Sequence, residues 1–192
     1  MLRKSLKIFI PIFSLLMFSN ISSQETWIKR FHKGTSSLNF GLYVKQLEDR
    51  NIIFTGCVSR DVVLMKTNSY GDSLWSAIYT QNRDWSIGYC VDITQDDGFI
   101  VTGTKGGKSF LIKTDGFGSY KWEKFYDNTT SGNYVNQSDD GGYFVVGDLF
   151  NMKTDFMGNV SWIQYYTFDY DLLGGREKNL IPVKKPKMKV QL

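Results

Sequence analysis

The chain has few of the residues that usually carry chemistry. Its 192 residues include one His, two Cys and three Pro. A single His allows only one Ser-His-Asp arrangement, and no nucleophile-elbow motif accompanies it. Two cysteines are too few for a disulfide framework, and no Cys or His cluster has the spacing of a metal site. We therefore expect no catalytic residue, no metal and no cofactor, and we interpret His32 as a loop residue.

Long hydrophobic runs are also scarce. The main one, residues 8–18, follows the basic residues Arg3, Lys4 and Lys7 and precedes the small and polar residues 20–24. This is the layout of a secretory signal peptide, and the run is too short to span a bilayer comfortably. We predict that residues 1–24 are removed and that the protein is secreted or displayed at the cell surface without stable membrane insertion. An uncleaved anchor is the alternative.

Positive charge is concentrated at the two ends of the chain. The formal net charge is +4, yet residues 25–175 carry more acidic than basic side chains. A mildly acidic body argues against a nucleic-acid-binding surface. Near the C-terminus, lysines alternate with Pro182 and Pro186, which favours a basic, poorly ordered tail over residues 169–192. Contact with a polyanion or a membrane surface is the alternative for this tail.

The sequence does contain an internal repeat. Two glycines, a Lys-Thr pair and a tryptophan recur three times with nearly the same spacing. The glycines and tryptophans are Gly41, Gly56 and Trp75, then Gly88, Gly103 and Trp122, then Gly132, Gly147 and Trp162. Repetition at roughly 40 to 48 residues is typical of solenoids and propellers. We expect one repeat domain over residues 25–168, with units at about 27–75, 76–122 and 123–162.

The second unit shows most clearly what one repeat contains. Alternating or β-branched segments at 88–94, 99–102, 109–114 and 120–126 predict four short strands. Turn residues separate them, including a type I turn at 115–118 with Asp first and Gly last. Four antiparallel strands in a unit of this length match one propeller blade. The sequence predicts an all-β, propeller-like array, with a β-sandwich as the competing solution.

The repeated residues have structural explanations. The paired glycines suit a close backbone approach or a positive φ, and the tryptophans suit packing between blades. We expect the lysine of each Lys-Thr pair to extend its charged end into water. The acidic pairs Asp96-Asp97 and Asp139-Asp140 are followed by Gly, as in hairpin turns. Calcium binding and paired-carboxylate hydrolysis are the less favoured interpretations of those pairs.

With these motifs, the chain resembles secreted bacterial β-propeller repeat proteins built from DGGY-IV-G … LIKTD--G---W units. Residues 96–103 with 111–115, Gly118 and Trp122 carry the pattern, and residues 139–147 with 153–155 repeat it. The resemblance covers about residues 27–162. It implies a propeller, export and often a C-terminal sorting signal. It implies a binding or display scaffold and no catalytic residues.

The predicted ring is incomplete. Residues 27–31 resemble the fourth strand of a unit but have no partners before them. The sequence thus predicts three four-stranded blades plus one extra strand, whereas closed propellers have about four to eight blades. Either this is a short or truncated member of a longer family, or two chains form a homodimer that completes a six-bladed ring through an isologous interface.

The cysteines allow a further expectation. Cys57 follows the end of a second strand and Cys90 lies near the start of the next first strand. Both should lie on the same rim of neighbouring blades, and export would permit their oxidation. Disulfide geometry is strict, so both a disulfide and two free thiols remain open.

Two classes of function fit these observations. The first is a non-enzymatic secreted or cell-surface scaffold that binds a protein partner. The alternative is a carbohydrate-binding, lectin-like propeller assembled from more than one chain. For the second, Tyr79, Tyr126 and Tyr166 are candidates because each follows its repeat tryptophan by the same distance. Strand packing explains these tyrosines equally well.

Overall fold

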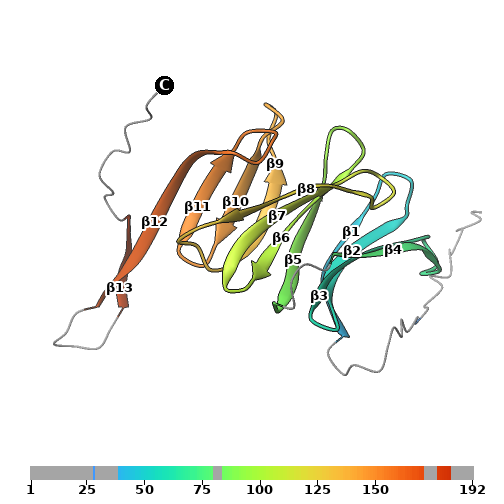
Figure 1. The fold of residues 1–192 in the computed structure, drawn as a ribbon, viewed down its shortest axis with the longest axis horizontal. Helices are drawn as coiled ribbons and strands as arrows, with labels where there is room; N and C mark the ends of the chain where they lie inside the picture. The colour runs from blue at the N-terminus through green and yellow to red at the C-terminus, as the bar shows by residue number, and fades with distance from the viewer. Residues whose placement is uncertain (1–27, 29–38, 80–83, 171–176, 183–192) are drawn as a thin grey trace, which may run out of the picture.

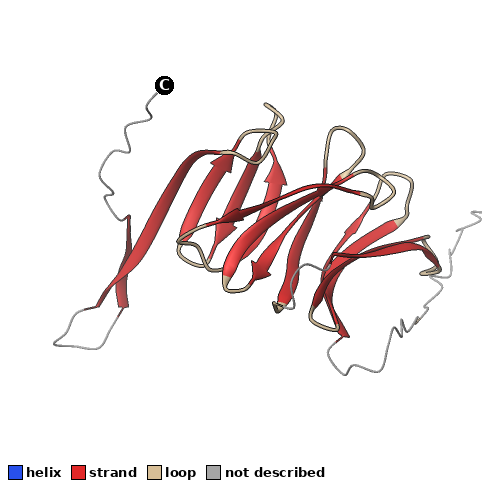
Figure 2. Cartoon of the chain, in the orientation of Figure 1, coloured by secondary structure: helices blue, strands red, loops and turns tan. Residues whose placement is uncertain are grey.

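The structure is a computed structural model, and it describes residue 28 and residues 39–79, 84–170 and 177–182. The described residues form strands joined by turns (Figures 1 and 2). Among these residues there is no helix long and apolar enough to cross a membrane. The predicted signal peptide, His32 and residues 183–192 lie outside this part of the chain.

Three antiparallel sheets lie in a row, each built from four strands that follow one another in sequence (Figure 1). The first blade contains β1 (Asn39–Gln46), β2 (Ile52–Val58), β3 (Asp61–Thr67) and β4 (Ser73–Tyr79). The second contains β5 (Ser86–Ile93), β6 (Phe99–Lys105), β7 (Lys108–Thr114) and β8 (Tyr120–Tyr126). The third contains β9 (Gly132–Gln137), β10 (Tyr143–Gly147), β11 (Phe150–Thr154) and β12 (Val160–Tyr170). The predicted all-β, open propeller-like array is confirmed.

The blades converge at their first strands. Strand β5 contacts both β1 and β9. Two hydrophobic clusters fill the spaces between blades. Ile53, Leu64 and Trp75 of the first blade meet Phe99 of the second. Ile100, Leu111 and Trp122 of the second blade meet Tyr143 of the third.

An additional strand follows the third blade. Strand β13 (Glu177–Pro182) pairs with the far half of β12. This differs from the expected poorly ordered tail over residues 169–192. Strand β12 has 11 residues where β4 and β8 have 7, so it runs past β11 and leaves an edge that a following segment can pair with. The extra strand expected at residues 27–31 lies outside the described residues, apart from Ile28.

The repeated glycines hold the first two strands of each blade together. Gly41 is paired with Gly56, Gly88 with Gly103, and Gly132 with Gly147. A Cβ at Gly56 or Gly103 would collide with the backbone of the facing strand. The expected close backbone approach is therefore confirmed, and none of these six glycines has a positive φ.

In the described part of the chain, positive φ is confined to the turns. Gly71, Gly118 and Gly158 end equivalent turns with φ of 78°, 77° and 79°. In the second of these turns, the Asp115 carboxylate accepts hydrogen bonds from the backbone N–H groups of Phe117 and Ser119. This confirms the predicted turn at residues 115–118.

Candidate functional site

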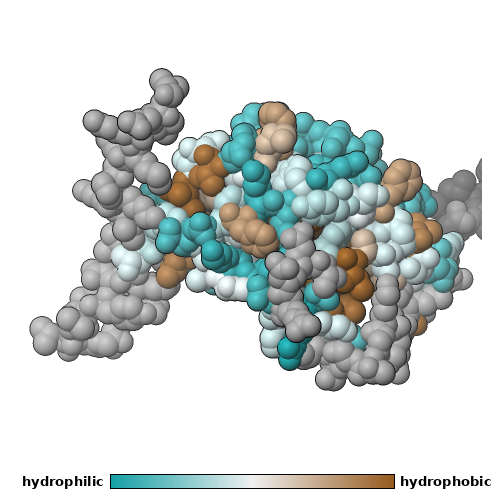
Figure 3. Space-filling model, in the orientation of Figure 1, coloured by the Kyte–Doolittle hydropathy of each residue, from teal (hydrophilic) through white to brown (hydrophobic). Residues whose placement is uncertain are grey.

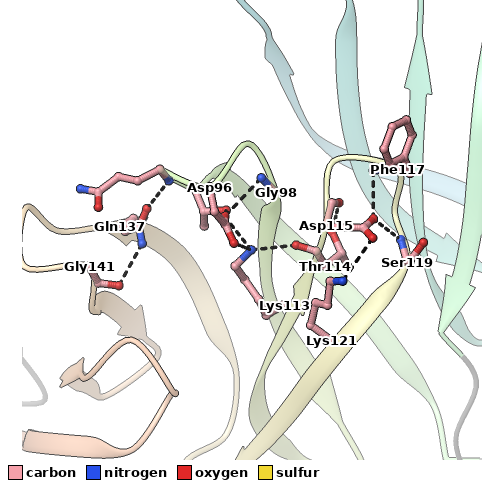
Figure 4. A network of polar contacts seen from close by, with 12 residues as sticks. Asp96, Gly98, Lys113, Thr114, Asp115, Phe117, Ser119, Lys121, Gln137 and Gly141 are labelled. Carbon is pink, nitrogen blue, oxygen red and sulfur yellow. Dashed lines mark hydrogen bonds and ion pairs between the residues drawn. The ribbon is translucent and has the colours of Figure 1, made fainter.

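Each blade repeats one ion pair between the first hairpin turn and the end of the third strand. Lys113 Nζ lies 2.9 Å from both carboxylate oxygens of Asp96 (Figure 4). It also donates a hydrogen bond of 2.7 Å to the Thr114 carbonyl. Lys153 makes the same contacts, at 2.8 Å to Asp140 and 3.0 Å to the Thr154 carbonyl.

This geometry corrects the expectation that these lysines extend into water. Lys113 and Lys153 are 6% and 8% exposed. An ammonium group removed from water needs a counter-charge and acceptors, and here the turn aspartate and a backbone carbonyl provide them. The acidic pairs thus contribute one carboxylate each to a turn. Among the described residues, no group of three or more His, Cys, Asp or Glu side chains could hold a metal.

The first blade has a looser version of the pair. Lys66 Nζ lies 3.4 Å from Asp49. The equivalent of Gly98 and Gly142 is Asn51, whose Nδ2 donates a hydrogen bond of 2.7 Å to Asp49. A Cβ at Gly98 or Gly142 would collide with the lysine ammonium group. Asn51 therefore takes the place that the lysine occupies in the other blades.

Two of the three tyrosines that follow the repeat tryptophans connect neighbouring blades. Tyr79 Oη donates a hydrogen bond of 2.8 Å to the Gly118 carbonyl, and Tyr126 Oη donates one of 2.8 Å to the Gly158 carbonyl. Burial raises the pKa of both phenols. Tyr166 accepts a hydrogen bond of 3.0 Å from Asn151 within its own blade. The structure therefore places the three tyrosines in separate positions and does not bring them together.

The cysteines are also kept apart. Cys57 and Cys90 are buried and free. The side chain of Cys90 belongs to the cluster between the second and third blades, where its Sγ lies 3.8 Å from the Val135 carbonyl oxygen. Cys57 lies on β2 of the first blade, which contacts β5, but the Cys90 side chain belongs to the cluster with the third blade. The two thiols therefore do not meet. The disulfide considered from sequence is absent here.

A polar hollow opens where the first strands end. It has a volume of about 660 Å³ and is lined by residues of all three blades. The lining combines charged and amide side chains with three apolar ones, Leu47, Ile93 and Phe99. This combination of a few polar groups with apolar surface is common in ligand sites.

Asp92 is the centre of this hollow. Its carboxylate is 8% exposed and pairs with Lys45 of the first blade. From the third blade it accepts hydrogen bonds from Asn136 Nδ2 at 3.3 Å and from the Gln137 backbone N–H at 3.0 Å. One carboxylate therefore connects β1, β5 and β9.

The electrostatics of the hollow keep Lys45 charged. Burial alone would lower the pKa of Lys45, but the hydrogen bond and charge of Asp92 outweigh it, and the pKa is raised. A lysine that stays protonated is a donor for a ligand oxygen and a poor general base. Gln137 connects the hairpin turns of the second and third blades beside the hollow. Its Oε1 accepts a hydrogen bond from the Gln95 N–H at 2.7 Å, and its Nε2 donates one to the Gly141 carbonyl at 2.9 Å (Figure 4).

The residues of this site are not among those that repeat identically in the sequence. Lys45, Asp92 and Asn136 occupy the same position in the three first strands, as the register with the second strands shows. Because the three residues differ, the repeated spacing of identical residues does not reveal them. The sequence signal for such a site is a position in the repeat that is polar in every unit but holds a different residue in each.

Comparison with known proteins adds little to this description. No family model and no curated protein matches the chain. A solved structure of a protein of unknown function from Bacteroides caccae is similar with a TM-score of 0.45 and 12% identity, over 68% of this chain and 56% of that one. The chain thus spans little more than half the length of that protein.

Proposed function

We propose that this chain is a non-enzymatic binding module of the propeller type, with the hollow around Asp92 as its ligand site. One observation carries the proposal: Lys45, Asp92 and Asn136 differ at a single repeat position and meet in one hollow. Identical charged residues at this position would repel one another, whereas these three side chains attract one another and line the hollow together. We infer that this polar group at the convergent ends of the first strands also receives a ligand.

The partner we propose is a protein that presents a polar segment to the hollow. Charges of both signs and side-chain amides suit peptide carbonyls, amides and charged side chains. The alternative is a carbohydrate, because the same carboxylate, amide and lysine groups hydrogen-bond sugar hydroxyls, and Phe99 and Ile93 offer apolar surface.

Two binding screens test the proposal and separate the two classes of ligand. The mature protein is screened on a glycan array and against a displayed library of random peptides. The hollow is altered in the double variant Lys45→Met/Asp92→Asn, which removes both charges together and so leaves neither buried alone. The control is Lys108→Met, at an exposed lysine in the β6–β7 hairpin.

We expect peptide ligands that bind the wild type and the control but lose at least tenfold in affinity for the double variant. Glycan hits with the same dependence would favour the carbohydrate alternative. The absence of any ligand that depends on the hollow would contradict the proposed site.

We also propose that the protein is exported, as its resemblance to secreted propeller repeat proteins implies. The basic residues before the apolar run at 8–18 support this. Intact-mass analysis of the protein from the medium or cell envelope should give a chain that begins near residue 25. A chain that retains Met1 and stays in the cytoplasm would contradict export.

A further inference from the structure

A second hollow adjoins the hollow around Asp92. It has a volume of about 350 Å³ and lies between the turns of the second and third blades, where Phe156 and Met157 contribute to its lining. Gln95 and Gln137 line both hollows, so the two meet at these residues. Both linings consist of residues in the described part of the chain. Together the hollows form one groove from the convergent ends of the first strands to the β11–β12 turn.

The middle of this groove offers amide groups. The Gln137 side chain is held across it by hydrogen bonds to the Gln95 N–H and the Gly141 carbonyl (Figure 4). Gln95 is exposed, and its side-chain amide can both donate and accept hydrogen bonds. A peptide main chain presents the same two kinds of group. The middle of the groove therefore suits a peptide main chain.

The end of the groove around Asp92 has an excess of negative charge. Four carboxylates line this hollow against two lysines. The two lysines are paired with Asp92 and Asp49, so the charges of Glu48 and Asp97 are in excess. Both of these residues are exposed. A Lys or Arg side chain of a ligand would be attracted to this end.

The end at the β11–β12 turn is more apolar. Phe156 and Met157 are 63% and 47% exposed, and the half-buried Trp122 belongs to the same lining. Each of the two lysines in this lining has a carboxylate partner. In Figure 3 a small apolar patch lies among hydrophilic surface along the upper edge, where the turns of the second and third blades lie in Figure 1. An apolar side chain of a ligand would bury area here.

We propose that the groove binds an extended peptide segment, with a Lys or Arg side chain in the hollow around Asp92 and an apolar side chain against Phe156 and Met157. This inference rests on the proposed binding function and names the kind of partner. An extended chain advances about 3.3 Å per residue, so the two side chains need a fixed separation along the peptide. A carbohydrate offers hydroxyl groups throughout and would gain little from the excess of carboxylates.

Selection from the displayed library of random peptides on the mature protein tests the proposal, followed by affinity measurements on the enriched peptides. Glu48→Gln/Asp97→Asn removes the excess charge, and Asn tolerates the φ of 59° at residue 97. Phe156→Ser/Met157→Ser removes the apolar end. The control is Phe117→Ser, at the turn position equivalent to Met157, which is 83% exposed and outside both linings. Far-UV circular dichroism shows that each variant is folded.

We expect the enriched peptides to share a Lys or Arg and an apolar residue at a fixed separation. Their affinity should fall about tenfold for Glu48→Gln/Asp97→Asn and about fivefold for Phe156→Ser/Met157→Ser, and change less than about twofold for Phe117→Ser. A peptide with Gln in place of its basic residue should bind the wild type and Glu48→Gln/Asp97→Asn equally well.

Peptides that need the hollow, as tested with Lys45→Met/Asp92→Asn, but keep their affinity for either altered variant would overturn this proposal and leave the proposed function standing. An equal loss for Phe117→Ser would also overturn it. Glycan ligands alone would overturn it in favour of the carbohydrate alternative. The absence of any ligand that depends on the hollow would overturn both this proposal and the proposed function.

Discussion

Tyr126 Oη donates a hydrogen bond of 2.8 Å to the carbonyl oxygen of Gly158, across the joint between the second and third blades. The phenol is 6% exposed, and the glycine ends the turn before β12 with φ of 79°. The same contact connects Tyr79 with Gly118. The fourth strands of the first two blades, β4 and β8, are thereby connected to the next blade through a carbonyl of its repeated turn.

We expect Tyr126→Phe to lower the free energy of unfolding by about 1–2 kcal/mol, because it leaves a carbonyl without its buried donor. Urea unfolding followed by fluorescence measures the change. Tyr120→Phe on the same strand is the control, since Tyr120 is 51% exposed, and it should change stability by less than about 0.5 kcal/mol. Equal effects of the two substitutions would show that the hydrogen bond from Tyr126 to Gly158 does not contribute to stability.

The repeated Asp–Lys pairs should differ in strength between blades. Asp96→Ala removes the counter-charge of a lysine that is 6% exposed, and we expect a loss of about 1–2 kcal/mol. Asp49→Ala should cost less than about 1 kcal/mol, because Lys66 is farther from its carboxylate, at 3.4 Å, and less buried. Thermal or urea unfolding of the two variants compares their losses of stability. A larger loss of stability for Asp49→Ala would contradict the expectation that the shorter, more buried pair contributes more.

The same pairs predict a pH dependence. Burial raises the pKa of Asp96, but hydrogen bonds from Thr94 and Lys113 outweigh it and the pKa is lowered. A hydrogen bond from Lys153, with others from Ser138 and the Gly142 N–H, lowers the pKa of Asp140. A lowered folded-state pKa contributes stability above the unfolded value of about 3.9, and this contribution is lost as the pH falls through the folded-state value.

Wild type should therefore exceed Asp96→Asn/Asp140→Asn in stability at pH 7 and pH 5, and the difference should shrink below about pH 4. Urea midpoints at pH 7, 5 and 3 measure it. A difference that stays constant down to pH 3 would show that these carboxylates do not titrate as the structure requires.

The reactivity of the two thiols tests whether the surfaces between the blades are packed as the structure shows. Burial raises the pKa of both Cys57 and Cys90, and a buried, protonated thiol reacts slowly. With a chromogenic disulfide reagent at pH 8, the native protein should react at least a hundredfold more slowly than the unfolded protein. After unfolding without a reductant, two thiols per chain should react. A yield of zero thiols would show that the cysteines are paired.

Much of the fold could be predicted because the same packing contacts recur in successive blades and require the same residue types. A close backbone approach explains why Gly56 and Gly103 recur, and packing on the next blade explains Trp75 and Trp122. The ion pair between Lys113 and Asp96 was missed because a lysine near a strand end usually reaches water, and sequence spacing alone does not bring it to a turn two strands away.

The candidate site was less accessible to prediction. Asp92 looks like an outward-facing polar residue in an alternating strand, and only the convergence of β1, β5 and β9 brings it to Lys45 and Asn136. Strand β13 was missed because its partner is an overlong β12, a length that does not follow from the repeat.

The central claim is that successive blades interlock through a threonine against a glycine, and a double-mutant cycle on Thr102 and Gly132 tests it most directly. Gly132→Ala should cost about 2 kcal/mol, because the new Cβ meets Thr102 Oγ1. Thr102→Ala removes that atom, leaving the Thr102 Cβ at 3.4 Å and Val145 at 3.3 Å. The account predicts that the double variant is more stable than the sum of the two losses by at least about 1 kcal/mol. Strictly additive losses would contradict it.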